Sequence, residues 1–299
     1  MGHDHSHHTG HVHTAPASGA LRLAFFINLA FTAIEAIGGW WTDSIAVLTD
    51  ALHDGGDCLV LGTAWYLQGV AARGRDADYS YGYGRFSMLG GWLTAMVLIA
   101  GAIFMLIVSI PRIGTDALPD TTGMMGIAVF GLLMNGFAAW KLHGGGTLNE
   151  HGAYLHLLED VLGWAAVLVG AAVMHFTAWA FVDPLLSIGI SIFILYNAVR
   201  TLHQGTRIMM QAQPDAIGQD KVREALMTIP EVTGIHDQHT WTLDGTYIIH
   251  TVHVVTGQVE AGRSTAIKAE VRSRLTAMGI HHATIEMELP GEPCTLEHH

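Results

Sequence analysis

The sequence predicts a polytopic α-helical membrane protein with six transmembrane helices, followed by a C-terminal cytoplasmic α+β domain of ferredoxin-like order α-β-β-α-β. Half of the 299 residues are hydrophobic and 13% are charged, a composition that excludes disorder and fits a wholly soluble protein poorly. Six apolar segments are each long enough to cross about 30 Å of hydrocarbon as a helix. The predicted division is a histidine-rich arm at 1–18, a membrane domain at 19–208, the cytoplasmic domain at 209–295 and a tag remnant at 296–299.

The balance of charge points to cations as partners. Lys and Arg number 14 against 26 Asp and Glu, a formal net charge of -12, so we do not expect nucleic acid to bind. The 20 histidines are the compositional anomaly and suggest metal handling. Cys58 and Cys294 lie too far apart in the sequence to indicate a disulfide framework or a zinc finger.

The first 18 residues contain no apolar run long enough for a signal peptide, so we predict a disordered arm that holds metal loosely. An expression tag is the alternative, and the irregular spacing of the histidines favours a native segment. The final Leu-Glu-His-His is typical of a vector remnant and carries no functional interpretation. The histidines of the arm are His3, His5, His7, His8, His11 and His13.

The six predicted spans are separated by segments rich in turn-forming residues, such as the three consecutive glycines at 144–146. An N-terminus in the cytoplasm places seven Lys and Arg residues inside and only Arg112 outside. The positive-inside rule therefore predicts that both termini are cytoplasmic. The spans lie at 20–41, 45–71, 88–110, 123–142, 152–175 and 179–201.

After residue 212, helical and strand patterns alternate, which indicates a soluble domain. Two strands surround the turn Asp244-Gly245, and a third strand ends the domain. Three strands with helices on one face predict a small α+β layer. The predicted helices lie at 219–227 and 261–278, and the strands at 235–243, 247–255 and 283–289.

Ionisable residues at membrane depth cost several kcal/mol unless they are paired or bound to something, so they are the most informative residues in the spans. They cluster in the second and fifth spans, and the other spans are nearly free of them. His53 and Asp57 are four residues apart, as are His156 and Asp160, so each pair lies on one helix face. The two clusters are Asp50, His53, Asp54 and Asp57, and His156, Glu159 and Asp160.

Two such pairs facing each other supply two nitrogens and two oxygens, which suits a tetrahedral Zn²⁺. A site for Mg²⁺ or Ca²⁺ would need more oxygen ligands. The alternative is that the pairs only join helices through hydrogen bonds, although uncharged Ser or Asn would do this at lower cost. We therefore predict a metal site between the second and fifth spans.

The motifs at these positions resemble those of the cation diffusion facilitator family. The second-span run SIAVLTDALHDGGD at 44–57, the fifth-span run LHLLEDVLG at 155–163 and the run IHDQHTW at 235–241 carry the likeness, which covers nearly the whole chain. The likeness is closest to the bacterial zinc, cobalt and cadmium efflux branch. It implies a proton-coupled exporter in the bacterial inner membrane, working as a homodimer with a metallochaperone-like cytoplasmic domain.

The resemblance also assigns residues. It implies a transport site of His53, Asp57, His156 and Asp160, and it matches Asp50 to an Asp that is not itself a metal ligand, so Asp50 is an accessory group. Asp54 departs from the family pattern. We interpret it as an accessory ligand or proton carrier, and a group that only faces a water-filled cavity is the alternative. In the cytoplasmic domain it places metal ligands at His236, His253 and Glu286, and solvated strand histidines are the alternative there. Asp76 matches an Asp that binds a second metal in some family members, but Tyr83 stands where the partner His would be, so we do not expect a site in that loop.

The expected cycle binds Zn²⁺, or Cd²⁺ or Co²⁺, from the cytoplasm on neutral His53 and His156 and releases it outside, where protons displace the metal. We do not expect an enzyme, because no general base of the HExxH type accompanies the ligands and all four would be occupied. A membrane-bound metal sensor or storage protein without transport is the alternative function. It leaves the paired ligands in two spans unexplained.

Overall fold

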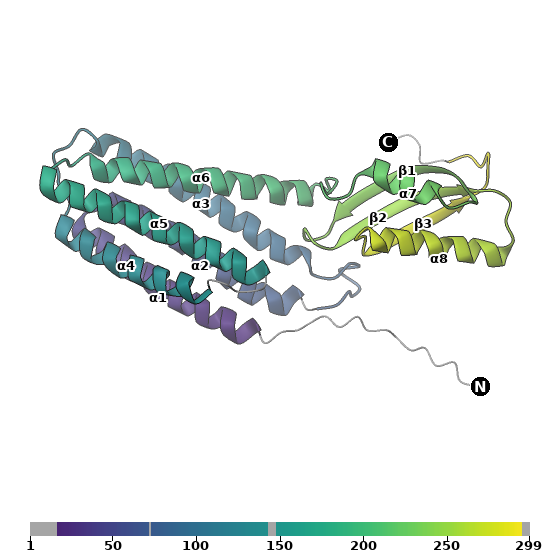
Figure 1. The fold of residues 1–299 in the computed structure, drawn as a ribbon, viewed down its shortest axis with the longest axis horizontal. Coiled ribbons are helices and arrows are strands. Elements are labelled where there is room, and N and C mark those ends of the chain that lie inside the picture. Colours follow the sequence, from purple (N-terminus) through teal and green to yellow (C-terminus); the bar gives the residue numbers. More distant parts are fainter. Residues whose placement is uncertain (1–16, 72, 143–147, 295–299) are drawn as a thin grey trace. The chain divides into compact units, whose positions relative to one another are not determined.

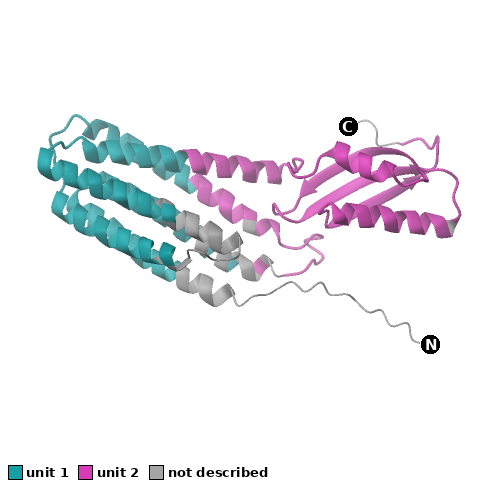
Figure 2. Ribbon diagram, viewed as in Figure 1, with its two compact units in different colours: residues 1–69, 97–195 teal, residues 70–96, 196–299 magenta. Residues whose placement is uncertain are grey.

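The computed structural model describes residues 17–71, 73–142 and 148–294, with long helices first and a small α+β domain after them (Figure 1). The chain divides into two compact units, residues up to 69 with 97–195, and residues 70–96 with 196–299 (Figure 2). The long helices are α1 (Ala17–Thr42), α2 (Ile45–Ala71), α3 (Arg85–Arg112), α4 (Thr121–Leu142), α5 (Leu148–Thr177) and α6 (Val182–Met209).

Each predicted span therefore overlaps one of these helices, although the sixth, at 179–201, begins before α6 does. By length and composition, three stretches of the described residues are apolar enough to cross a membrane: Met88–Arg112, Asp160–Thr177 and Val182–Met209. Thr121–Phe137 of α4 is a shorter apolar stretch. Large apolar side chains such as Trp41 and Phe176 are more than 80% exposed, as expected for helices that face lipid. The predicted glycine turn at 144–146 lies outside the described residues.

The core of the first unit is built around Trp164 of α5, which is fully buried. Gly131 of α4 lies directly against the indole of Trp164, leaving no room for a side chain at that position. Small residues at such crossings let transmembrane helices approach closely. The residues packed with Trp164 come from α2, α4 and α5: Val47, Met124, Ala128, Val167, Ala171 and Met174.

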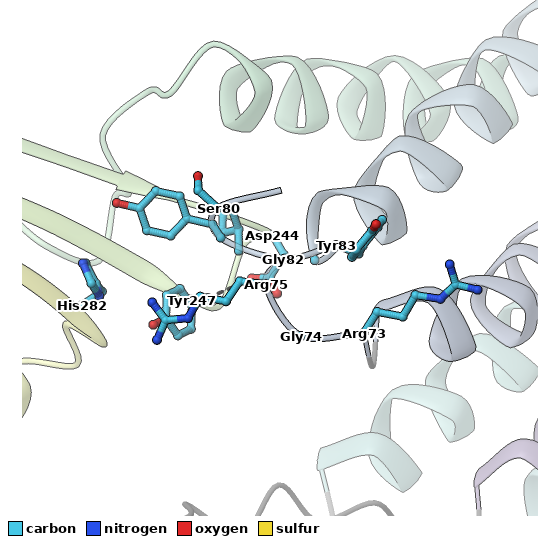
Figure 3. Close-up of a pocket in the computed structure, with 12 residues that line it drawn as sticks. Arg73, Gly74, Arg75, Ser80, Gly82, Tyr83, Asp244, Tyr247 and His282 are labelled. Carbon is cyan, nitrogen blue, oxygen red and sulfur yellow. Dashed lines mark hydrogen bonds between the residues drawn. The ribbon is translucent and has the colours of Figure 1, made fainter. Parts of the chain in front are cut away.

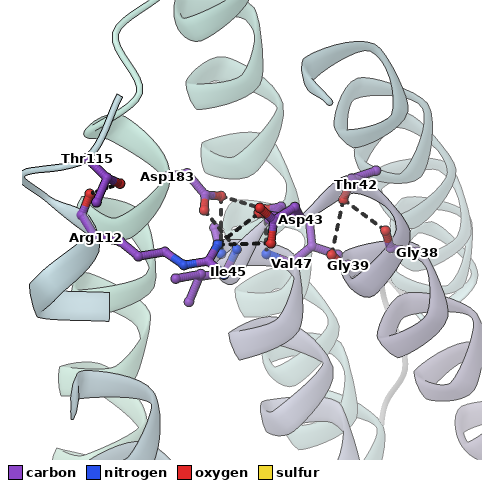
Figure 4. A network of polar contacts seen from close by, with 11 residues as sticks. Gly38, Gly39, Thr42, Asp43, Ile45, Val47, Arg112, Thr115 and Asp183 are labelled. Atoms are coloured by element: carbon purple, nitrogen blue, oxygen red, sulfur yellow. Dashed lines mark hydrogen bonds and ion pairs between the residues drawn. The ribbon is translucent and has the colours of Figure 1, made fainter. Parts of the chain in front are cut away.

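A buried carboxylate at the start of α6 holds the first turn of α2 (Figure 4). Asp183 is 2% exposed and accepts hydrogen bonds from Ser44 Oγ at 2.5 Å and from the amides of Ile45 at 2.8 Å and Ala46 at 3.2 Å. Ser44 Oγ in turn accepts the amide of Val47 at 3.1 Å. The first amides of a helix lack intrahelical partners and attract negative charge, so Asp183 and Ser44 together fix where α2 begins.

A chain of hydroxyl groups continues this connection one turn further along α2. Thr49 Oγ1 lies 2.6 Å from Ser187 Oγ of α6, which lies 2.7 Å from Ser109 Oγ of α3. All three side chains are buried. Polar contacts of this kind join transmembrane helices in a fixed register, and here they set the position of α2 against α3 and α6.

The second unit contains the α+β domain, in the predicted element order. The strand order in the described sheet is β1-β2-β3, with β1 antiparallel to β2 and β2 parallel to β3. Residues Val222 and Leu226 of the first helix and Ile267, Val271 and Leu275 of the second are fully buried in its core. The elements are α7 (Gln219–Met227), β1 (Val232–Thr242), β2 (Ile248–Thr256), α8 (Ala261–Ala277) and β3 (His282–Glu288).

The β1-β2 turn is held by Asp244, as the sequence predicts from Asp244-Gly245. Its Oδ1 accepts the amides of Thr246 and Tyr247 at 2.9 and 2.8 Å. Burial opposes ionisation of Asp244, but these hydrogen bonds outweigh it and lower the pKa of the carboxyl group. Gly245 adopts φ +98°, a conformation that side chains disfavour, so glycine suits this turn.

Candidate metal sites

One turn of α2 places a histidine and two carboxylates together inside the first unit. His53 Nδ1 lies 3.4 Å from Asp57 Oδ2 and 3.5 Å from Asp54 Oδ1. Asp160 of α5 completes the group, and one ligand atom from each of the four residues lies within 4.8 Å of the others. Atoms bound to one Zn²⁺ at about 2.0 to 2.2 Å are separated by distances in this range, so the cluster is suited to a metal ion.

The cluster borders a cavity of about 440 Å³ between α2, α5 and α6. Asp50, His53 and Asp160 line it together with Gly163 and Phe193. A Cβ atom at Gly163 would stand 3.7 Å from Asp50 Oδ1, an ordinary van der Waals contact, so the carboxylate of Asp50 lies beside the backbone of α5. The cavity gives the cluster the open space that an ion needs to enter.

The structure thus brings His53, Asp57 and Asp160 together, with Asp54 in the same cluster and Asp50 beside it. His156 lies on α5 one turn before Asp160, and its side chain is outside the described residues. The prediction for His156 therefore remains a prediction.

One ionisable residue of this region was not predicted as part of a site. The spans other than the second and fifth are nearly free of ionisable groups, but Glu35 of α1 is fully buried and interacts with Asp54. The rule that charged residues at membrane depth are functional candidates applies to a single carboxylate as well as to a pair, and would have identified Glu35.

A second cluster lies on the sheet of the α+β domain. His236 of β1 and His253 of β2 are register partners, and Glu288 of β3 reaches both. The carboxylate of Glu288 lies 3.0 Å from His236 Nε2 and 2.6 Å from His253 Nδ1. Cys294 Sγ lies 3.6 Å from the same nitrogen of His253. These four residues form the second group whose ligand atoms lie within 4.8 Å of one another.

Glu286, the carboxylate predicted for this domain, occupies a different position. Its Oε2 lies 3.3 Å from His253 Nε2, where Asp237 Oδ2 also lies, at 3.4 Å. His253 therefore has Glu288 and Cys294 at one ring nitrogen and Glu286 and Asp237 at the other. Neither Glu288 nor Cys294 is assigned to this site by the sequence, because their nearness to His253 arises from the fold.

His250, two positions after Ile248 in β2, packs inside the domain. It is fully buried, and its Nδ1 shares a hydrogen bond of 2.8 Å with Thr240 Oγ1. Burial lowers the pKa of His250 to about 4, with a smaller contribution from His239. The imidazole is therefore neutral at physiological pH, and its contacts explain its presence without a metal.

The loop between α2 and α3 uses its aspartate to shape the backbone. Asp76 Oδ1 accepts the amides of Asp78 and Tyr79 at 3.0 and 2.8 Å, and Oδ2 accepts the hydroxyl of Tyr83 at 2.8 Å. The hydrogen bond from Tyr83 is the main reason that the pKa of Asp76 is lowered. The hydroxyl of Tyr83 therefore uses the carboxylate oxygen of Asp76 that a second metal would require.

The same loop borders a cavity of about 300 Å³ within the second unit (Figure 3). Arg73 and Arg75 line it from the loop, Tyr247 lines it from the β1–β2 turn and His282 lines it from β3. Two guanidinium groups make this cavity unfavourable for a metal cation.

Comparison with known proteins finds matches along nearly the whole chain. A family model described as the cation efflux transmembrane domain matches residues 21–210, and one described as the cation efflux protein cytoplasmic domain matches 214–290. The chain is 31% identical over 285 residues to the cadmium, cobalt and zinc/H(+)-K(+) antiporter of Bacillus subtilis, covering 93% of this chain and 92% of that protein.

Two further relatives span nearly the whole chain. The metal cation efflux system protein CzcD of Cupriavidus metallidurans is 31% identical over 290 residues, 95% of this chain and 91% of that protein. The zinc transporter ZitB of Escherichia coli is 30% identical over 299 residues, 98% and 94% of the two chains. With both family models matched in order along the sequence, the chain belongs to the cation efflux family, the cation diffusion facilitators, which are membrane transporters and not enzymes.

Proposed function

We propose that this protein exports Zn²⁺ from the cytoplasm in exchange for protons, by alternating access of an intramembrane site. The observation that supports this most directly is the convergence of His53 and Asp57 of α2 with Asp160 of α5 beside an open cavity. His156, one turn from Asp160, is proposed as the fourth ligand, which gives the two nitrogens and two oxygens that Zn²⁺ accepts in a tetrahedron.

Proton exchange follows from the chemistry of the proposed ligands. Metal binds the neutral imidazoles and ionised carboxylates, and protons bind the same atoms. An ion that leaves toward a more acidic compartment is therefore replaced by protons, and an inward proton gradient drives metal outward. The Bacillus subtilis relative is named as an antiporter for protons and potassium, so proton coupling has a precedent in a similar chain.

The names of the relatives also support a wider range of substrates, with Cd²⁺ and Co²⁺ beside Zn²⁺. Soft and borderline divalent cations share a preference for imidazole ligands, and geometry rather than intrinsic affinity selects among them. We place the protein in a bacterial inner membrane as a homodimer, with both termini in the cytoplasm. The positive-inside count supports the orientation, and the match to the efflux-protein cytoplasmic domain supports dimerisation.

Proton-driven export is tested in vesicles that contain the purified full chain and a trapped zinc-sensitive dye. We expect zinc flux to follow an imposed pH gradient, to reverse when the gradient is reversed and to fall to the leak rate when an ionophore collapses it. Cadmium or cobalt added in excess should compete with zinc. Vesicles with no gradient-dependent flux of any of the three metals would favour the sensor or storage function instead.

For the cytoplasmic domain we propose a regulatory metal site on His236 and His253. Glu288 and Cys294 are the further ligands that the geometry favours, and Glu286, the carboxylate expected from the sequence, serves as the matched alternative. Imidazole, carboxylate and thiolate groups are all ligands that Zn²⁺ accepts. Metal bound there would tie β1, β2 and the C-terminal segment together and stiffen the domain.

The two glutamates provide a direct comparison. In a chain whose intramembrane site is disabled by Asp160→Ala, we expect Glu288→Gln to weaken zinc binding to the cytoplasmic cluster by more than about 10-fold, because loss of a ligand exceeds the loss of a supporting contact. Glu286→Gln should have a smaller effect. Isothermal titration of both variants measures the difference, and an equal or larger loss in Glu286→Gln would assign the ligand to Glu286.

A further inference from the structure

Helices α4 and α5 pack side by side and run in opposite directions, and two contacts fix their register (Figure 1). Thr121 Oγ1 at the start of α4 lies 3.0 Å from His175 Nδ1 near the end of α5. Further along α4, Gly131 lies against the indole of Trp164, which precedes His175 on α5. Each residue forward on α4 therefore faces about one residue backward on α5.

This register places Asn135 of α4 beside Asp160 of α5. Asn135 follows Gly131 by one helical turn, and Asp160 precedes Trp164 by one turn. Asn135 shares a helix face with Ala128 and Gly131, as Asp160 does with Trp164, and both Ala128 and Trp164 are fully buried in one core. The amide of Asn135 and the carboxylate of Asp160 therefore form the next layer of the α4–α5 interface.

The side chain of Asn135 has a hydrogen-bond donor that helix packing does not explain. Its nitrogen Nδ2 is buried and has no hydrogen-bond partner among the described residues. A buried donor without a partner destabilises a protein, and the hydrocarbon core contains no water to replace it. Between Thr122 and Lys141, Asn135 is the one amide, hydroxyl or charged side chain in the sequence of α4. An apolar residue would pack at this position at lower cost.

Asp160 is the neighbour for which such a donor is useful. It belongs to the cluster of possible ligands with His53 and Asp57, and it lines the cavity beside them. A carboxylate that binds a metal through one oxygen keeps a second oxygen that accepts hydrogen bonds. In protein metal sites a neighbouring group generally donates to this oxygen and fixes the orientation of the ligand.

We propose that Asn135 is a positioning residue of the transport site. When an ion is bound, its Nδ2 donates a hydrogen bond to the oxygen of Asp160 that does not contact the ion. This bond holds the other oxygen toward His53 and Asp57. The inference rests on the proposed function, because it takes Asp160 as a ligand of the transported ion. Zinc binding then depends on the packing of α4 against α5 as well as on the helices that supply the ligands.

Asn135→Leu tests the role of the donor, because leucine has nearly the shape of asparagine but cannot donate. The full chain is titrated in detergent with Co²⁺, which shares ligands with Zn²⁺ and absorbs visible light most strongly in a tetrahedral site. A His253→Ala background disables the cytoplasmic cluster, and the histidine arm is the same in all variants. We expect Asn135→Leu to weaken Co²⁺ binding by about 10-fold. Asn197→Leu, at an exposed position of α6, is the matched control and should leave binding unchanged.

A double-mutant cycle separates an action through Asp160 from a general effect on packing. In an Asp160→Ala background, Asn135→Leu should weaken the remaining Co²⁺ binding by less than about 2-fold, because the carboxylate that Asn135 positions is gone. Losses that add in full would show that Asn135 acts elsewhere and would overturn the proposal. Unchanged Co²⁺ binding in the single variant Asn135→Leu would overturn it as well.

Zinc flux in vesicles provides a second readout. Asn135→Leu should raise the zinc concentration for half-maximal flux by about 10-fold, with a smaller fall in the maximal flux. A role in folding alone would lower the maximal flux and leave the half-maximal concentration unchanged, which would contradict a positioning role. Co²⁺ binding is measured without transport, so a native chain that binds Co²⁺ but moves no metal would count against the proposed function alone.

Discussion

Asp57→Ala and Asp160→Ala are each expected to reduce gradient-driven zinc flux by more than about 100-fold, while the protein still inserts and purifies as a folded species. Asp57 and Asp160 come from different helices, and their carboxylate oxygens lie within 4.8 Å of each other and of a nitrogen of His53. Loss of one oxygen ligand leaves three groups for an ion that takes four. Even the loss of a residue that only supports a ligand lowers metal affinity or activity by about 10- to 100-fold.

The vesicle assay with trapped zinc dye measures this effect, with Asp116→Asn as a control that removes an equal charge from an exposed loop. The protein recovered from the vesicles should elute at the same volume in all cases, which separates loss of a ligand from loss of folding. Transport at an unchanged rate in either alanine variant would mean that the ion crosses the membrane at another site.

Asp183→Ala is expected to cause the largest loss of stability among substitutions in the first unit. The side chain accepts hydrogen bonds from one hydroxyl and two amides at the start of α2, all buried. Each buried donor left without a partner costs about 1–3 kcal/mol, and partial relaxation of the helix end reduces the sum. We therefore expect the free energy of unfolding to fall by about 3 kcal/mol.

Cys58 of α2 is 4% exposed and provides the readout, since a thiol-reactive dye labels it only when the helix opens. The measurement uses a Cys294→Ser background and follows labelling of detergent-purified protein during heating. Asp183→Asn retains one acceptor oxygen and should lose less stability than Asp183→Ala.

The neighbouring Asp43 provides the control for charge. Its carboxylate lies 3.0 Å from Arg112 Nη1, but its side chain is 66% exposed, and exposed ion pairs contribute at most about 1 kcal/mol. Asn also tolerates the positive φ of 55° at this position. Asp43→Asn should therefore change the labelling temperature little. A fall as large as that of Asp183→Ala would show that the network acts through the ion pair with Arg112.

The element order and the transport-site candidates followed from the sequence because they depend on local spacing. A helix repeats every 3.6 residues, so His53 and Asp57 share a face in any fold in which the segment is helical. Their functional role could also be predicted, because a charged side chain in a membrane-spanning helix is costly and is retained mainly where it has a function. In the same way, the alternation after residue 212 predicted the strands, and Asp244-Gly245 predicted the turn between them.

Contacts between distant segments were decided by the tertiary structure. The choice between Glu286 and Glu288 illustrates this, since both lie on the same face of β3 and only the register with β2 and the path of the C-terminal segment bring Glu288 to both His236 and His253. The contact between Asp76 and Tyr83 is a second example. The two residues are seven positions apart in a loop, and a loop conformation cannot be predicted from a periodic sequence pattern.

By itself, the sequence determined that this protein is a six-helix membrane transporter with an α+β domain and that two helices carry His and Asp pairs. Only the tertiary structure decided that Glu35 of α1 faces Asp54, that Asp183 holds the first turn of α2 and that Cys294 lies beside His253. The physical reason is that side-chain spacing within one helix or strand is set by backbone geometry. Which faces of different elements meet is set by packing over the whole chain.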